Sequence, residues 1–460
     1  ETRGERLIKK LEGILRLAIL CLGVYLVYTL YRPQADRLIR EVKEQVFTTT
    51  ENPAALLTEE RQEETEAQKT LSFPARYDSR NYGRAPDVRN QGSLGTCWAV
   101  AAVSALEASL LPEEHLRFSA DHLSLQNGYA KSQDDGGAYT MTMAYLTAWK
   151  GPVLAEEDPY GDGYSPEGLS PRKHVQEIQI LRDRASIKEA VQAHGAVQTS
   201  LYMDVQSDYS SVYYNERTAS YCYPKEEAPN HDILIIGWDD DFPASGFTYN
   251  VKGNGAYICQ NSWGTSYGEN GIFYVSYEDP NIAGYALAYS RVEEPDNYDS
   301  IYQSDLLGWV GQLGYGTDSC YFANVYTSRG AEELKAVGFY AVGENTEYEI
   351  AIVDEFQNEL SLSAFSPVQT GTLAHAGFYT IDLNEPVSLS EGQRFAVAVK
   401  VRTPGESYPA ATEYKADEYT ETVDLSDGEG YISMKGYQWT RTETEYSCNI
   451  CLKAYTDKEG

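Results

Sequence analysis

Basic residues are scarce in this sequence. The 460 residues contain 37 lysines and arginines against 69 aspartates and glutamates, so the formal net charge is −32 at pH 7. Nucleic acids and anionic lipid surfaces attract proteins of the opposite charge. This balance therefore argues against both as principal partners, and no nucleic-acid binding is expected.

Cysteine is also sparse, with seven residues scattered along the chain, so the sequence contains no dense disulfide scaffold. Cys448 and Cys451 form a C-x-x-C pair, but residues 446–455 have the pattern of a strand. Residues three apart in a strand point to opposite faces, which disfavours a shared redox or metal role. The acidic loops lack the ligand spacing of a calcium site. No metal or organic cofactor is expected.

Long hydrophobic runs are absent apart from one near the start. Residues 17–31 carry no charge, and the run extends back to Ile14 if the Arg16 side chain reaches the membrane surface. About 18 apolar residues can just span a bilayer. Basic residues precede the run and no small-x-small cleavage site follows closely, so an uncleaved signal anchor is favoured over a removed signal peptide or a buried helix. Residues 33–72 are polar and acidic, and are interpreted as a stalk or a short pro-segment.

A glycine-bearing loop, Gln91–Thr96, ends in Cys97 and leads into a run of small apolar residues. A thiol at a helix N-terminus ionises more easily, so Cys97 is a candidate nucleophile; an inert cysteine opening a core helix is the alternative. The apolar spacing predicts a helix from Cys97 that stops at Pro112. Further helices are predicted from the N-cap Ser119, after two glycines through to Trp149, and at 187–193.

Two predicted strands carry polar ends. His231 stands at the mouth of a buried apolar run, 231–238, and the strand within 255–264 ends in Asn261-Ser262-Trp263-Gly264. Considered singly, each is an ordinary core strand, and a lone histidine is more often structural. The other histidines, apart from His375 in the C-terminal region, lie in or beside helical patterns.

Together these segments resemble the papain family of cysteine peptidases, over residues 73–291. Cys97 precedes His231 by 134 residues and Asn261 by 164, in the order and near the separation that the family shows. Several flanking blocks agree with the family too: Gln91, residues 119–123, Gly136-Gly137 and residues 187–190.

The resemblance implies a role for each matched residue. Cys97 would be the nucleophile, His231 its ion-pair partner and general acid, and Asn261 the group that orients the imidazole. Gln91 would donate its side-chain amide, beside the Cys97 backbone N–H, to the oxyanion. Trp263 would shield the Asn261–His231 hydrogen bond from water and border the substrate site.

The sequence departs from the family at several positions. Leu94 stands where most plant and animal members have a cysteine, and Asp135 stands where its disulfide partner would be, so this member is expected to do without that bridge. Tyr267 replaces a second tryptophan. Asp232 stands where a small residue contributes to the P2 pocket, and we hypothesise that its carboxylate favours a basic P2 residue.

The region after residue 294 has alternating apolar stretches separated by turn residues, which predicts an antiparallel β-sandwich. It resembles the lectin-like β domain that follows papain-type domains in some surface proteins of anaerobic Gram-positive bacteria. The matching stretches are 321–326, 334–340, 377–383 and 450–456. A carbohydrate ligand is implied by the domain's name and fold alone. A structural or peptide-recruiting module is the alternative.

The sequence therefore predicts an α+β protein with four parts. These are a cytoplasmic tail and membrane-spanning signal anchor (1–32), the acidic segment (33–72), a two-lobed papain-like domain (73–294) and a β-sandwich (295–460). The two domains are expected to have separate cores. The predicted function is a cysteine endopeptidase at the outer cell surface, with Gly136, Gly137, Asp232 and Trp263 binding protein or peptide substrates. A secreted form follows if the anchor is cleaved, and a surface adhesin that uses the papain-like domain as a scaffold is the alternative.

Overall fold

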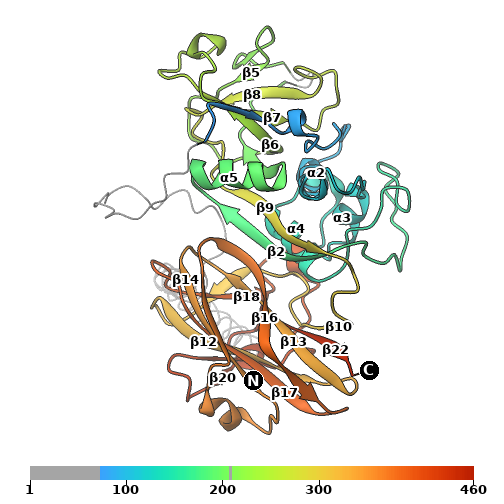
Figure 1. Ribbon diagram of the computed structural model, residues 1–460, viewed down its shortest axis with the longest axis vertical. Helices are drawn as coiled ribbons and strands as arrows, with labels where there is room; N and C mark the ends of the chain where they lie inside the picture. Colours follow the sequence, from blue (N-terminus) through green and yellow to red (C-terminus); the bar gives the residue numbers. More distant parts are fainter. Residues whose placement is uncertain (1–72, 207–209, 460) are drawn as a thin grey trace, which may run out of the picture. The chain divides into compact units, whose positions relative to one another are not determined.

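The computed structural model describes residues 73–206 and 210–459 (Figure 1). The predicted signal anchor and the acidic segment 33–72 both lie outside these residues. Within the described ranges, no helix has the length and apolar character needed to cross a bilayer.

The helices of the N-terminal half begin close to the predicted positions. Ser119 caps α3, because its hydroxyl accepts the His122 backbone N–H at 3.0 Å, and Asp183 caps α5 in the same way through Ser186 at 2.9 Å. The α2 helix is almost wholly buried, and most of its residues are alanine, valine or leucine. The bounds are α2 (Cys97–Leu110), α3 (Ala120–Gln126), α4 (Tyr139–Thr147), α5 (Arg184–His194) and, near the C-terminus, α6 (Thr442–Glu445).

The strands of the peptidase-like region pair almost entirely in antiparallel fashion. The central strand β6 lies between β3 and β7, and β1 also pairs with β6. The exception is β5, which runs parallel to β8. The bounds are β1 (Arg76–Asp78), β2 (His174–Leu181), β3 (Val197–Leu201), β4 (Tyr214–Asn215), β5 (Ser220–Tyr221), β6 (His231–Asp239), β7 (Ala256–Gln260), β8 (Ile272–Ser276) and β9 (Ala286–Glu293).

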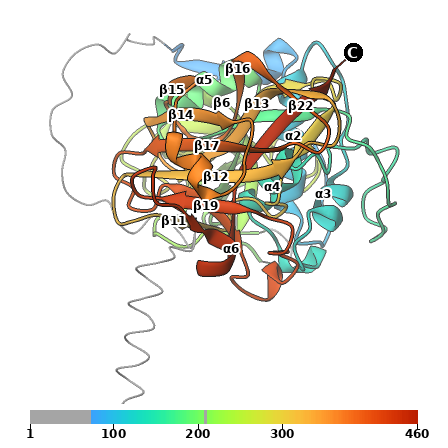
Figure 2. The same cartoon turned by 90° about the horizontal axis from the view of Figure 1, so that it is seen from below.

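The C-terminal region contains the predicted antiparallel sheets. One follows the order β15-β14-β17-β12-β19-β20, and a smaller one follows β11-β18-β21. Strands β12 and β17 lie side by side in both views (Figures 1 and 2). The bounds are β10 (Ser300–Tyr302), β11 (Gly311–Leu313), β12 (Ser319–Thr327), β13 (Glu332–Ala341), β14 (Thr346–Val353), β15 (Gln369–Leu373), β16 (Ala376–Leu389), β17 (Arg394–Arg402), β18 (Ala410–Tyr414), β19 (Gly430–Ser433), β20 (Thr440–Arg441), β21 (Cys448–Ile450) and β22 (Leu452–Lys458).

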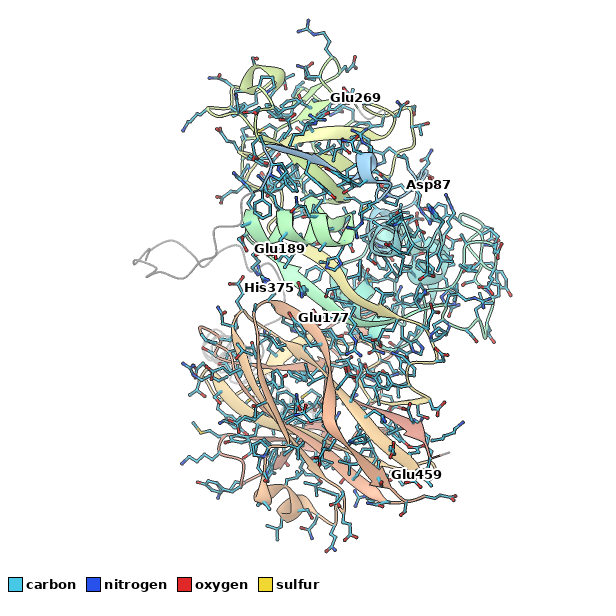
Figure 3. The ribbon with its side chains drawn as sticks, viewed as in Figure 1. Asp87, Glu177, Glu189, Glu269, His375 and Glu459 are labelled. Atoms are coloured by element: carbon cyan, nitrogen blue, oxygen red, sulfur yellow. The ribbon has the colours of Figure 1, made fainter. Side chains whose placement is uncertain are left out.

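The two regions share a sheet, which the sequence analysis did not predict. Strand β16 pairs with β2, so β10, β22, β13 and β16 continue the sheet that contains β2, β9 and β6. In Figure 3, Glu177 and His375 mark the place where these two strands meet. One hydrophobic cluster contains Trp98 and Ile178 from the first region together with Tyr340 and Phe378 from the second. Each region also has a cluster of its own residues, so the shared cluster joins two cores that the sequence analysis had expected to be separate.

The C-x-x-C segment also differs from its prediction as one strand. The chain changes sheets at Cys451: β21 pairs with β18 in the smaller sheet, whereas β22 pairs with β13 in the shared sheet. All six described cysteines are free, and no cluster of metal-ligating side chains occurs within 73–206 and 210–459.

Candidate active site

Cys97 is the first residue of α2, and the packing of this helix fixes its position. The side chain of the N-cap residue Thr96 makes no capping hydrogen bond, so the amides of the first turn are left for other acceptors. The backbone N–H groups of Cys97, Trp98 and Asp232 lie close enough to the thiol to lower its pKa. Because Asp232 follows His231 directly, the start of β6 lies near the thiol.

His231 opens β6 and contacts both residues that the family pattern pairs with it. Its Nε2 lies 2.7 Å from Asn261 Oδ1, and the indole of Trp263 stacks on the imidazole with ring centroids 4.7 Å apart. Asn261 is 2% exposed, so water has little access to this hydrogen bond. Since an amide oxygen can only accept, Nε2 carries the proton, and Nδ1 is the basic nitrogen of the neutral ring.

The pKa values of both groups are displaced by burial. Burial and, to a smaller extent, the nearby Asp232 carboxylate raise the pKa of the Cys97 thiol to about 12. Burial lowers the pKa of His231 to about 4, and the hydrogen bond that His231 donates to Asn261 opposes this shift. Burial thus disfavours both the thiolate and the imidazolium of the ion pair that the resemblance implies. The thiol–imidazole and thiolate–imidazolium forms hold the same number of protons, so an internal proton transfer interconverts them.

Gln91 lies on the loop before α2, with its side chain held in one orientation. The Ser262 hydroxyl donates to Gln91 Oε1 at 2.5 Å, and the Gln91 backbone N–H donates to the Ser262 carbonyl oxygen at 2.8 Å. Gln91 Nε2 donates one of its hydrogens to the Leu94 carbonyl oxygen at 2.9 Å. The second hydrogen of Nε2 is not used in this bond, which is compatible with the predicted role of Gln91 as an oxyanion donor.

Asp232 is 8% exposed and has two partners from β3. Its Oδ2 accepts Gln198 Nε2 at 2.8 Å, and its Oδ1 accepts the Ser200 hydroxyl at 2.7 Å. Tyr285 and Tyr289 extend this network by contacting Ser200 and Gln198 respectively. Burial raises the pKa of the carboxyl to about 6, and the two hydrogen bonds oppose this shift. Asp232 thus places a buried titratable charge next to the thiol.

The glycine pair lies beside the residue that follows the nucleophile. At Gly137, an added Cβ would be only 2.2 Å from the Trp98 indole, so any larger residue would displace this ring. Gly136 has a φ of +69°, a backbone conformation that favours glycine. The pair therefore keeps the backbone close to Trp98, the residue that follows Cys97, and its proposed contact with substrate stays a prediction.

Sequence reasoning missed the residues that hold these groups in place. Ser262 lies inside the Asn-Ser-Trp-Gly motif, but the motif alone does not indicate that Ser262 binds Gln91. The partners Gln198 and Ser200 alternate on β3 and face β6, a placement that follows from strand register and carries no motif. His174 opens strand β2 where a helical surrounding was expected, but it stacks on Trp149 with ring centroids 3.7 Å apart and lies outside the site.

Comparison with known protein families matches both regions. Residues 73–290 match the description "Papain family cysteine protease", and residues 301–456 match "Lectin like domain". Pro-cathepsin H of Mus musculus is 27% identical over 233 residues, which cover 48% of this chain and 65% of that protein. A cysteine protease of Blomia tropicalis is 28% identical over 217 residues, which cover 44% of this chain and 61% of that protein. The chain thus spans less than two thirds of these relatives' length.

Solved structures extend the likeness over both regions. The clostridial cysteine protease Cwp84, determined after propeptide cleavage, is 25% identical with a TM-score of 0.73, covering 84% of this chain and 99% of that one. A structure of the protease and lectin-like domains of Cwp84, a surface layer associated protein of Clostridium difficile, has a TM-score of 0.73 at 24% identity, covering 85% and 90%. This second likeness shows the fold alone.

The order of Cys97, His231 and Asn261, their arrangement around α2 and β6, and these matches lead to one assignment. Residues 73–290 form a papain-family cysteine peptidase domain, and residues 301–456 form a lectin-like domain.

Proposed function

We propose that the chain is an endopeptidase that cleaves peptide bonds through a thioester on Cys97. The observation that supports this most directly is the hydrogen bond from His231 Nε2 to Asn261 Oδ1, which leaves Nδ1 basic at the start of β6. The Asp232 amide that lies near the Cys97 thiol belongs to the same strand. The base and its orienting group thus lie at the start of the strand whose second residue, Asp232, neighbours the nucleophile.

The steps follow from these groups. The Cys97 thiol gives its proton to His231 Nδ1 as the sulfur attacks the peptide carbonyl carbon. Gln91 Nε2 and the Cys97 N–H stabilise the oxyanion; losing one such donor typically costs about a hundredfold or more in rate. His231 then protonates the leaving amine, and the C–N bond breaks to leave a thioester. Water, deprotonated by His231, attacks the thioester and releases the carboxylic acid product and the thiol.

Labelling by a thiol-directed peptidyl epoxide tests this proposal. We expect one equivalent to react selectively with Cys97, because the other described cysteines are buried whereas Cys97 is partly exposed. Peptide mapping of the labelled chain identifies the modified residue. Equal labelling of all cysteines, or none, would instead favour the adhesin alternative, in which the papain-like domain serves as a scaffold.

Surface location and a carbohydrate ligand are further parts of the proposal. The surface location rests on the apolar run at residues 14–31, which is interpreted as a signal anchor. Cwp84, whose fold is similar, is described as a surface layer associated protein. Carbohydrate binding by residues 301–456 is supported by the family description alone. We accordingly place protein and peptide substrates first among its partners.

Asp232→Asn is expected to accelerate alkylation of Cys97 by iodoacetamide at pH 7. Above pH 6 the carboxylate is charged and disfavours the thiolate, so the neutral amide lowers the thiol pKa; we expect about a threefold or greater rate increase.

The pKa of the Asp232 carboxyl is raised on folding, so its ionisation destabilises the folded state as pH rises through about 6. The melting temperature of the wild type should therefore fall between about pH 4 and 6, and this fall should be absent in Asp232→Asn.

The same variant tests the proposed P2 preference. Peptides that differ only in Arg or Leu at P2 should show a preference for Arg that falls in Asp232→Asn. If both proteins prefer Leu equally, the Asp232 carboxylate interacts only with Gln198 and Ser200 and does not contact the P2 side chain.

A further inference from the structure

The nucleophile loop, defined as residues 91–96, carries the Gln91 amide and ends at Cys97. Both proposed oxyanion donors, Gln91 Nε2 and the Cys97 N–H, therefore depend on this loop for their spacing. No disulfide ties it to the rest of the described chain, because all six described cysteines are free. Other contacts must hold the loop in place.

Tyr160 contacts both ends of the nucleophile loop through one hydroxyl. The Tyr160 hydroxyl donates to the Gln91 carbonyl oxygen at 2.9 Å. The Thr96 hydroxyl shares a hydrogen bond with the same phenol oxygen, and Thr96 is completely buried. One side chain thus joins the residue that carries the oxyanion amide to the residue that precedes the nucleophile.

Asp121, in the first turn of α3, holds the segment that carries Tyr160. It is completely buried, and its Oδ2 accepts the backbone N–H of Gly161 at 2.8 Å. Its Oδ1 accepts Gln133 Nε2 at 2.7 Å. Each carboxylate oxygen therefore binds a different loop, and one of these loops carries Tyr160.

The Gln133 loop packs directly against the nucleophile loop. A Cβ added to Gly95 would be 2.9 Å from the Gln133 carbonyl oxygen and 3.0 Å from the Gly136 amide nitrogen. The backbones are thus in contact at the position next to Leu94. Asp135, the family's other disulfide position, instead accepts the Ser132 amide at 2.9 Å and closes its own turn.

We propose that Tyr160 and Asp121 are positioning residues that form a hydrogen-bonded clamp on the nucleophile loop, in the region where other members have a disulfide. The clamp keeps Gln91 Nε2 and the Cys97 N–H at the spacing that an oxyanion requires. Its effect on catalysis depends on the proposed peptidase function, whereas its effect on loop mobility does not.

A purely structural role and a positioning role predict different kinetics. The oxyanion exists only in the transition states, so loosening its donors lowers kcat and leaves KM nearly unchanged. Alkylation by iodoacetamide requires the thiolate but no oxyanion donor, so its rate should not change. Partial unfolding would lower kcat and the alkylated fraction together.

The experiment compares the full chain with Tyr160→Phe and a matched control, Tyr379→Phe. Tyr379 lies on β16 and donates its hydroxyl to the His375 carbonyl oxygen at 2.8 Å, so the control loses the same kind of hydrogen bond elsewhere. The measurements are amide hydrogen exchange over residues 91–97, kcat and KM on a fluorogenic peptide, and the rate of Cys97 alkylation by iodoacetamide.

For Tyr160→Phe we expect amide exchange over 91–97 to accelerate by about tenfold. We expect kcat to fall by about tenfold with KM and the alkylation rate within twofold of the wild type. Asp121→Asn, which retains one acceptor oxygen for two donors, should accelerate exchange at the same amides. The control should match the wild type in all three measurements.

Unchanged exchange over 91–97 in Tyr160→Phe would overturn the clamp, and so would a parallel loss of kcat and alkylation. If the wild-type chain cleaves no peptide and its Cys97 is not selectively alkylated, the proposed peptidase function fails. The exchange comparison would still decide whether the clamp exists.

Discussion

Replacing His231 with alanine is expected to lower kcat/KM on a peptide substrate by about a thousandfold or more. The imidazole is both the acceptor of the Cys97 proton and the donor to the leaving amine, so its loss removes two proton transfers. Burial also raises the pKa of the thiol to about 12, so without His231 almost no thiolate forms at pH 7. Steady-state kinetics on a fluorogenic peptide measure the loss.

The matched control is His115→Ala, because His115 is exposed and lies after α2, outside the site. Its activity should equal that of the wild type. Asn261→Ala should cause a smaller loss than His231→Ala, because the base remains but its ring is no longer held. A His231→Ala protein that retains wild-type activity would refute the assigned mechanism.

The activity of the wild type should also report the His231 pKa. Lowering pH adds a proton to the neutral thiol–imidazole pair, and the resulting imidazolium can no longer accept the thiol proton. Since burial lowers the His231 pKa to about 4, the acid limb of kcat/KM should lie well below the usual range of histidine.

The sequence was sufficient to predict the chemical groups of the site because each stands at the end of a regular element. Cys97 begins α2, His231 begins β6, and Asn261 follows β7. Their positions could therefore be predicted from the apolar pattern of each element and from the spacing between the three residues. The hydrogen bond between His231 and Asn261 is what such placement leads one to expect. Their catalytic roles remain predictions that the variants above test.

The supporting contacts could not be predicted in this way. Tyr160 and Asp121 are far apart in sequence, and they meet the nucleophile loop through irregular segments whose path depends on tertiary packing. Asp232 was placed at the P2 pocket by analogy, whereas its partners Gln198 and Ser200 follow from the register of β3 against β6. Register is set by the whole sheet, which no local pattern encodes.

The sequence pattern also does not predict the sheet that the two regions share. The acidic break near residue 294 is typical of a domain boundary, and both flanking strands, β9 and β10, have ordinary patterns. The strands that join the regions, β2 and β16, are about two hundred residues apart. In β2, the alternation of Ile178 and Ile180 with polar residues predicts a strand but not its partner.

The peptidase region alone, residues 73–294, is expected to lose its cooperative fold. Removing the rest would expose the edge of β2 and strip Trp98 and Ile178 of neighbours such as Tyr340 and Phe378. Burying each large apolar side chain contributes about 1.5–3 kcal/mol, and a whole domain is stable by only about 5–15 kcal/mol. Circular dichroism melts and size-exclusion chromatography of 73–294 and 73–460 measure the difference.

A point substitution tests the same junction without truncation. Gly377 lies in β16 opposite Gln179 with a φ of +148°, and an added Cβ would lie 2.0 Å from the Ile178 carbonyl oxygen. Gly377→Ala therefore has to separate β16 from β2 or strain the backbone. Gly392→Ala is the control, because Gly392 also has a positive φ, +76°, but open space around it.

We expect Gly377→Ala to lower the melting temperature by several degrees more than Gly392→Ala, about 2 kcal/mol in unfolding free energy. Because the shared cluster contains Trp98, next to the nucleophile, the transition should remain single and peptide hydrolysis should disappear in the same temperature range. A fragment 73–294 that melts like the longer chain, or equal effects of the two glycine substitutions, would show that the peptidase core is independent. The lectin-like domain would then contribute nothing to the stability of the active site.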